Sequence, residues 1–387
     1  MPIIQVNNLN LANKKVLIRS DLNVPIKNKK IVSYARIDAS LPTIELALKK
    51  NAKVIVASHL GRPTEGKYTE ELSLFPIFKY LEKKLKTIKV HFCKNYLNGL
   101  DTKPGELTLL ENVRFNQGEK TNSVSLSKAY ANLCDIFVMD AFGSLHRNES
   151  STYGLSKYSK IACSGLLLEH ELTTLKKLLK NPVQPLVTIV GGAKISTKFN
   201  LLKSLSKISE TLIVGGGIAN TFIAIDNNVG KSLYEPNFVN QAKLLRDNHN
   251  IFIPIDSRVS TTFNENSIGI TKKISKIHAN EEIMDFGDKT IERMIPILKK
   301  AKTILWNGPI GVFEFKNFRR GTKILAETIA DSNSFSIAGG GDTLSVIEML
   351  KIKNKISYIS TGGGSFLKFL ENKEFPIIKL LKRFVNK

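Results

Sequence analysis

The sequence has little cysteine, and its cysteines follow no pairing pattern. Three cysteines occur among 387 residues, at Cys93, Cys134 and Cys163, and no two of them have the C-x-x-C spacing of zinc and redox motifs. The small number of cysteines and the absence of this spacing argue against both a disulfide framework and a zinc site. We interpret the three as reduced core residues.

A long apolar run is also missing from the N-terminal segment. Residues 1–15 read MPIIQVNNLNLANKK, with no basic stretch followed by an apolar one, so neither a secretory signal nor a membrane span is indicated. A hydrophobic content of 42% over 387 residues suits two ordinary globular domains. We expect a soluble cytoplasmic protein with no membrane partner.

Acidic residues are scarce relative to basic ones, 34 against 57, which gives a formal charge of +23. A basic nucleic-acid-binding protein is therefore one candidate class. The lysines, however, are spread along the polar sides of amphipathic stretches such as 78–86 and 172–180, without an aromatic-interleaved patch. We predict no specific nucleic-acid partner.

The first half alternates short apolar runs with helical patterns. Strands are expected at 16–18, 54–57, 107–110 and 136–139, an order typical of a doubly wound parallel α/β sheet. Ligands bind beyond the carboxyl ends of such strands. The basic residues that follow these ends are Arg36, His59, Arg62, Arg114, His146 and Arg147. Taken singly each arginine is a surface ion-pair partner, but together they favour a small polyanion bearing carboxylate or phosphate.

The alternation pauses at 165–180, which forms one amphipathic helical pattern. It ends at Asn181-Pro182 and Pro185, and proline interrupts helical hydrogen bonding. We place the domain boundary here, with a first lobe at 1–170, a helix and connector at 171–185 and a second lobe at 186–369.

The second half repeats a pattern in which a strand runs into glycines. The expected strands are 186–190, 211–214, 303–306, 335–338 and 357–360, and 251–255 adds one that ends at Asp256 without glycine. Glycine-rich turns on one edge of a sheet predict a cradle for phosphates and a nucleotide.

Residues 193–202 have apolar positions at helical spacing after Gly191-Gly192. We expect a helix there, with Lys194 and Lys198 one turn apart on one face so that both ammonium groups reach the same anion, although both lysines could equally be solvated. Asp342 follows three glycines and suits a magnesium ion on nucleotide phosphates; a helix N-cap is the alternative role.

Two common nucleotide motifs fail on inspection. Gly230-Lys231-Ser232 resembles the end of a P-loop, but Ile225 stands where the first glycine is required. Gly215 and Gly217 match the first two glycines of the dinucleotide fingerprint, but Asn220 stands where the third glycine is required. This difference argues against a dehydrogenase-like dinucleotide binder.

Eight segments in the expected order closely resemble the phosphoglycerate kinase family. They are RSDLNVP at 19–25, SHLGRP at 58–63, ENVRF at 111–115, DAFGSLHR at 140–147, GGAKISTK at 191–198, WNGPIGVFE at 306–314, GGGDT at 339–343 and STGGGSFL at 360–367. The resemblance implies two doubly wound, Rossmann-like lobes joined by a helical hinge, with the tail 370–387 packing back on the first lobe. It also implies magnesium-dependent phosphate transfer between 1,3-bisphosphoglycerate and ADP, giving 3-phosphoglycerate and ATP, by a monomer.

The same resemblance assigns roles residue by residue. It implies that the phosphoglycerate is held by Asp21, Asn23, Arg36, His59, Leu60, Gly61, Arg62, Arg114 and Arg147. The nucleotide would be held by Lys198, Glu314, Gly340, Gly341, Asp342 and Thr343, with Glu314 on the ribose and Asp342 on magnesium. Arg36 and Lys194 would be the catalytic charges nearest the migrating phosphoryl group.

Three positions beside the arginines depart from the family pattern. Ser144 and Leu145 stand where the family usually has threonine and alanine, and Glu149 stands where it often has histidine. We expect these changes to weaken phosphoglycerate binding.

Overall fold

The computed structural model describes residues 3–27, 29–371 and 373–384. The chain divides into two compact units, one formed by the residues up to Thr174 together with those from Glu374 onward, and the other by Leu175–Lys373. No helix in these ranges is long and apolar enough to cross a membrane.

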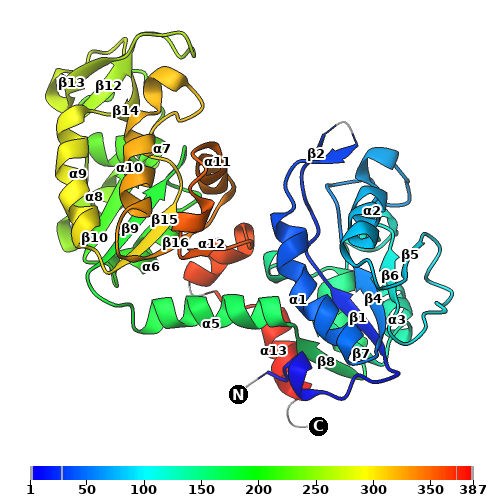
Figure 1. The fold of residues 1–387 in the computed structure, drawn as a ribbon. Helices are drawn as coiled ribbons and strands as arrows, with labels where there is room; N and C mark the ends of the chain where they lie inside the picture. Colours follow the sequence, from blue (N-terminus) through cyan, green and yellow to red (C-terminus); the bar gives the residue numbers. More distant parts are fainter. Residues whose placement is uncertain (1–2, 28, 372, 385–387) are drawn as a thin grey trace. The chain divides into compact units, whose positions relative to one another are not determined.

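The first unit is built on a parallel sheet with the strand order β5-β6-β4-β1-β7-β8 (Figure 1). Its strands are β1 (Lys15–Arg19), β4 (Lys53–Ala57), β5 (Val90–Cys93), β6 (Leu107–Leu110), β7 (Ile136–Met139) and β8 (Ile161–Ser164), and a hairpin comprises β2 (Ile26–Lys27) and β3 (Lys30–Ile31). Its helices are α1 (Ala35–Lys49), α2 (Phe75–Lys84), α3 (Val124–Asn132), α4 (Leu155–Tyr158) and α13 (Pro376–Arg383). The four strands expected from the sequence are confirmed, and β5 and β8 extend the sheet at its edges.

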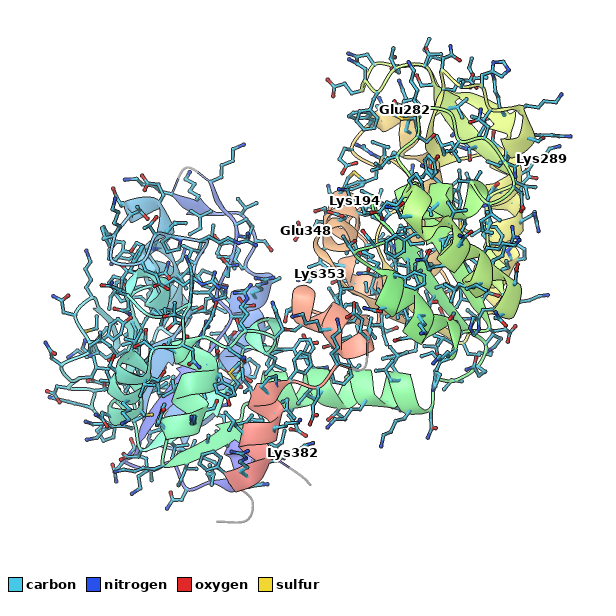
Figure 2. The ribbon with its side chains drawn as sticks, turned by 180° about the vertical axis from the view of Figure 1, so that it is seen from behind. Lys194, Glu282, Lys289, Glu348, Lys353 and Lys382 are labelled. Atoms are coloured by element: carbon cyan, nitrogen blue, oxygen red, sulfur yellow. The ribbon has the colours of Figure 1, made fainter. Side chains whose placement is uncertain are left out.

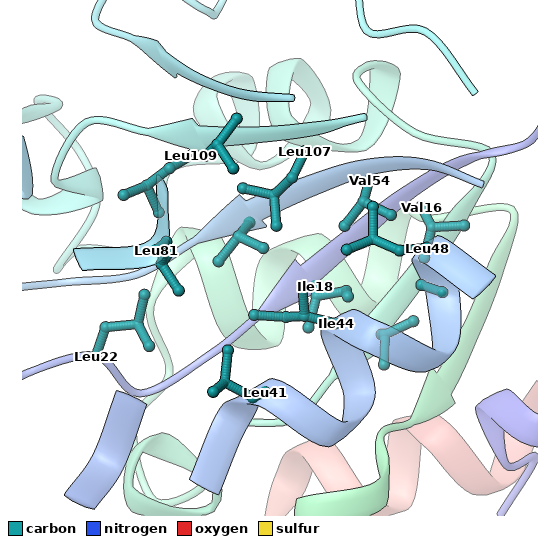
Figure 3. Close-up of a cluster of buried hydrophobic side chains, with 14 of the residues drawn as sticks. Val16, Ile18, Leu22, Leu41, Ile44, Leu48, Val54, Leu81, Leu107 and Leu109 are labelled. Carbon is teal, nitrogen blue, oxygen red and sulfur yellow. The ribbon is translucent and has the colours of Figure 1, made fainter. Parts of the chain in front are cut away.

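One face of this sheet packs against α1 and α2. Alternate residues of the strands, such as Val16 and Ile18 on β1, meet Ile44 of α1 and Leu81 of α2 in one buried cluster (Figure 3). The intervening residues, such as Leu17, are equally buried on the other face. Burial on both faces explains why the strands are continuous apolar runs.

The second unit has a parallel sheet with the order β11-β10-β9-β15-β16-β17. Its strands are β9 (Leu186–Gly191), β10 (Thr211–Gly215), β11 (Ile251–Phe252), β15 (Thr303–Asn307), β16 (Phe335–Ala338) and β17 (Tyr358–Ile359). The helices are α6 (Phe199–Ser206), α7 (Gly216–Ile223), α8 (Val239–Asn248), α9 (Asp288–Lys300), α10 (Arg320–Ala330), α11 (Gly341–Met349) and α12 (Gly364–Leu370). The expected parallel α/β class is therefore confirmed in both units.

Two expectations for the second unit are wrong. The strand expected at 251–255 ends at Phe252, and Asp256 instead begins β12 (Asp256–Ser260), which pairs antiparallel with β13 (Ile270–Lys273) and β14 (Glu282–Phe286). The helix expected at 193–202 begins only at Phe199. The backbone amide and the hydroxyl of Ser196 both donate hydrogen bonds to the Glu235 carboxylate. These bonds hold the segment before Phe199 as a turn.

The amphipathic pattern after Gly165 forms α5 (Leu166–Lys180), as expected, and its first residues are fixed by buried acceptors. The amide of Leu166 donates to Thr43 Oγ1 at 3.0 Å, and that of Leu168 donates to Asp140 Oδ1 at 3.0 Å. A Cβ at Gly165 would lie 2.2 Å from Asp140 Oδ1, so this contact requires glycine. Burial raises the pKa of Asp140 to about 7.

The C-terminal helix α13 belongs to the first unit, where it contacts β8 and α4. Leu381 is fully buried and Arg383 is exposed. Replacing Leu381 with alanine leaves a cavity and should lower the free energy of unfolding by about 2–5 kcal/mol. Denaturant unfolding followed by circular dichroism measures this, with Arg383→Ala as the exposed control. Equal effects of the two variants would contradict the burial of this helix.

Candidate functional site

The carboxyl ends of β1, β4, β6 and β7 meet at one edge of the first sheet, where arginine and histidine side chains gather. His59 lies between two guanidinium groups: Arg19 Nη2 is 3.2 Å from its Nδ1, and Arg147 Nη1 is 3.1 Å from its Nε2. Burial, and then the positive charges around it, lower the pKa of His59 well below 6.5. The imidazole is therefore neutral at pH 7 and carries one ring proton.

A neutral imidazole accepts only one of these two contacts, because arginine can only donate. Arg19 is fully buried and fixed, since its Nε donates to Ser151 Oγ at 2.9 Å and its Nη1 to the Ser20 carbonyl at 2.6 Å. This fixed position of Arg19 favours Nδ1 as the acceptor, which would leave the ring proton on Nε2 beside Arg147. The Arg147 side chain is 28% exposed and is the one that can turn toward an anion.

A second group connects β1 to α1 and to the loop after β4. Arg36 Nη1 donates to the Asn23 carbonyl at 2.8 Å and lies 3.4 Å from Asp21 Oδ1. Asn23 Oδ1 in turn accepts from the amide of Gly61 at 2.9 Å. The predicted residues Asp21, Asn23, Arg36 and Gly61 are thus brought together by direct hydrogen bonds.

Arg114 lies deeper in the same cluster. Its Nη1 donates to the Gly61 carbonyl at 2.7 Å and its Nη2 to Glu149 Oε1 at 2.6 Å, and both side chains of this ion pair are less than a tenth exposed. Leu60 is buried, with its backbone held by the Asn112 side chain. Arg62 is exposed.

Sequence reasoning missed the support of this cluster. Glu119 is fully buried and accepts from Ser151 Oγ at 2.5 Å, and Ser151 accepts from Arg19. Burial raises the pKa of Glu119 to about 7. A signal was present, because Arg19 opens the RSDLNVP segment directly after the strand expected at 16–18, but no role was assigned to it.

In the second unit a cavity of about 300 Å³ lies between the glycine turns and the small antiparallel sheet. Glu314 and Asp342 line it, as do Glu282 and Phe263, which the sequence did not single out. Phe263 contacts Phe315 with ring centroids 5.0 Å apart, and it is 60% exposed. The cavity thus has an aromatic wall and several carboxylates, Glu282 among them (Figure 2).

Lys198 is turned inward at the carboxyl ends of β9 and β15. Its Nζ donates to the Gly191 carbonyl at 2.6 Å and to Asn307 Oδ1 at 2.8 Å. Both acceptors are neutral, so the ammonium keeps a third hydrogen, and no carboxylate of the described residues forms an ion pair with it. Burial lowers its pKa to about 8, against the opposing effect of Asp342.

The glycine turns mostly contact one another. A Cβ at Gly191 would lie 1.7 Å from the Pro309 carbonyl oxygen, and one at Gly216, whose φ is 62°, would lie 2.8 Å from that of Gly192. A Cβ at Gly340, whose φ is 103°, would lie 2.7 Å from Asn307 Nδ2. These glycines permit loop-to-loop packing, which the sequence pattern alone did not distinguish from contact with a ligand.

The remaining predicted nucleotide residues differ in exposure. Gly341 and Asp342 are exposed at the start of α11. Thr343 is buried, where its Oγ1 accepts from the amide of Gly308 at 2.7 Å and donates to the Gly339 carbonyl. Lys194, labelled in Figure 2, is exposed in the turn before α6. It therefore does not share a helix face with Lys198.

A family model described as phosphoglycerate kinase matches residues 6–373. The chain belongs to the phosphoglycerate kinase family. It is therefore a kinase, a phosphotransferase.

Relatives support this membership along the whole length. A phosphoglycerate kinase of Buchnera aphidicola subsp. Baizongia pistaciae (strain Bp) is 68% identical over 387 residues, covering 100% of this chain and 98% of that protein. One of Buchnera aphidicola subsp. Acyrthosiphon pisum (strain Tuc7) is 62% identical over 388 residues, covering 100% of both.

Solved structures of phosphoglycerate kinases share the fold. That from Coxiella burnetii has a TM-score of 0.90 at 45% identity, with 99% of each chain covered. That from Pyrococcus horikoshii OT3 has a TM-score of 0.82 at 28% identity, with 100% of each chain covered.

We predict that Lys198 contacts a nucleotide phosphate, in which case its lowered pKa makes nucleotide binding depend on pH. Free Lys198 loses its proton above pH 8, whereas a bound phosphate keeps it protonated. We expect the Kd of ADP to be lowest below pH 8 and to rise by up to about tenfold per pH unit above it, with proton uptake on binding.

Calorimetric titration in two buffers of different ionisation enthalpy measures both effects. Lys198→Arg is the control, because arginine keeps its charge throughout this range. If the Kd of ADP rose with pH equally in both proteins, Lys198 would not contact the phosphates.

Proposed function

We propose that the chain catalyses the reversible, magnesium-dependent transfer of the acyl phosphate of 1,3-bisphosphoglycerate to ADP, giving 3-phosphoglycerate and ATP in glycolysis. The observation that carries the proposal is the pairing, in one family member, of an arginine cluster suited to a small acid with a cavity suited to a nucleotide. These features lie in different units, as two different substrates require.

The acid is proposed to bind at the arginine cluster. Arg36, Arg62, Arg114 and Arg147 supply positive charge for its carboxylate and phosphate, and His59 supplies a neutral Nε2–H donor. Asp21 and Asn23 orient Arg36, while Leu60 and Gly61 contribute the backbone of the loop. This arrangement favours a ligand with two anionic ends over one with a single charge.

The nucleotide is proposed to bind in the 300 Å³ cavity. Glu314 suits the ribose hydroxyls, and the Lys198 ammonium suits a phosphate. Gly340, Gly341 and Thr343 form the loop that begins α11, where free backbone N–H groups favour phosphate. Asn307 bonds to this loop through the Gly339 carbonyl and to the Lys198 ammonium, so it fixes the distance between the loop and Lys198.

Magnesium is proposed to bind together with the nucleotide. The described residues contain no cluster of three or more His, Cys, Asp or Glu side chains that would hold a metal by itself. An exposed carboxylate, Asp342, fits an ion that takes one or two protein carboxylates and the remaining ligands from phosphates and water. When bound, the ion would neutralise charge on the phosphates.

Transfer itself requires positioning and charge stabilisation rather than a covalent enzyme intermediate. We propose that Arg36 and Lys194 stabilise the negative charge on the migrating phosphoryl group. Lys194 is exposed, so its ammonium is accessible for this role. The direct test of the function is ADP formation from ATP that depends on 3-phosphoglycerate, measured in a coupled assay.

In that assay, replacing Lys194 with alanine should lower kcat by about 10²–10³, the usual effect of removing one donor that acts in the transition state. The Kd of ATP should change much less. Wild-type kcat together with lost ATP binding would make Lys194 a ground-state ligand instead.

In-line transfer brings donor and acceptor together, so we propose that the units close during the reaction in a monomeric, cytoplasmic enzyme. Small-angle scattering should give a smaller radius of gyration with 3-phosphoglycerate and a non-hydrolysable ATP analogue than with either alone. An unchanged radius at saturation would rule closure out.

A further inference from the structure

The arginine cluster contains one carboxylate in direct contact with a predicted substrate arginine. Glu149 Oε1 lies 2.6 Å from Arg114 Nη2 and 4.0 Å from Arg147 Nη1, and the Glu149 side chain is 8% exposed. An incoming acid therefore meets a negative charge already present among the positive ones.

Glu149 is fixed in this position by the backbone as well. It precedes the π-helical turn η5 (Ser150–Gly154), its side chain accepts from the backbone of Thr152, and its own amide donates to Thr152 Oγ1 at 3.2 Å. The bond from the Thr152 backbone needs an acceptor oxygen on the side chain of residue 149, and the amide oxygen of a glutamine supplies one as well. The cap thus explains the side chain's location but does not require its charge.

The Glu149–Arg114 ion pair has one hydrogen bond rather than the two of a bidentate pair. Among the described residues, Glu149 Oε2 and Arg114 Nε are both buried without a hydrogen-bond partner. Neither side chain could be buried alone at low cost, because a desolvated charge needs an opposite one. Arg114 is therefore neutralised locally and is only 6% exposed in its side chain.

We propose that Glu149 is an internal counter-ion that occupies Arg114 and lowers the affinity of the arginine cluster for the phosphoglycerate, so that residue 149 sets acid affinity in this enzyme. The proposal rests on the proposed function for the identity of the acid. Arg114 then acts mainly through its bond to Gly61, and Arg147 and Arg36, which are more exposed, provide most of the attraction.

The test compares Glu149→Gln with Glu65→Gln in the full chain. Glu65 lies in the same unit, but its carboxylate accepts from the amides of Gly118 and Lys120 rather than from an arginine. Removing the charge at residue 149 should lower the Kd of 3-phosphoglycerate by about 3–10-fold, because a nearby like charge is removed from a partly buried anion site. Glu65→Gln should leave it unchanged, and ATP affinity should not change in either variant.

Stability gives a second readout that separates this role from a purely structural one. Loss of Glu149 leaves the arginines without their counter-ion, so Glu149→Gln should lower Tm while it tightens acid binding. A structural role alone would lower Tm and weaken binding. Weaker or unchanged binding in a folded Glu149→Gln protein would overturn the proposal.

Two further arms keep the result decisive. If Glu149→Gln does not fold, Glu149→Asp keeps the charge but withdraws it from Arg114 by one methylene, and should tighten binding by about 2–3-fold; wild-type affinity in that variant would overturn the proposal. Inorganic sulfate is titrated in parallel. Tighter sulfate binding without any binding of 3-phosphoglycerate would uphold the role of Glu149 while refuting the proposed substrate.

Discussion

The arginine cluster of the first unit depends on the parallel pairing of β1 with β4 on one side and β7 on the other. This pairing brings the loops after three strands to one edge, so that Arg19, His59 and Arg147 contact each other although they are far apart in sequence. Hydrogen bonding within the sheet thus offsets the repulsion between the like charges that are brought together. The apolar cluster beneath the sheet, formed with α1 and α2, makes the pairing rigid.

Charge compensation among these arginines comes from buried carboxylates. Glu149 pairs with Arg114 directly, and Glu119 acts on Arg19 through Ser151. The arginines must lie close together in the folded chain even when no anion is bound, and the two buried carboxylates offset part of their mutual repulsion. The cost is a lower positive potential toward the ligand.

The sequence predicted the strands and their common edge because both follow from local apolar runs and a simple topological rule. It left the solvated position of Lys194 open as an alternative, but it did not predict the inward turn of Lys198, because one partner of that ammonium, Asn307, is distant in sequence. The antiparallel sheet β13-β12-β14 was not predicted either, because β13 is almost wholly exposed and has no alternation of apolar and polar residues to indicate a strand. Glu149 was noticed only as a departure from a family pattern, and its ion pair required coordinates.

The packing of glycine against glycine in the second unit limits how its cavity can change. Gly191 lies against Pro309, and Gly216 against Gly192, with no space for even a methyl group. A single substitution at any of these positions would push two loops apart rather than reshape one. The walls that carry side chains, such as Phe263 and Glu282, are free of this restriction, so substitutions there can reshape the cavity while the glycine turns stay constant.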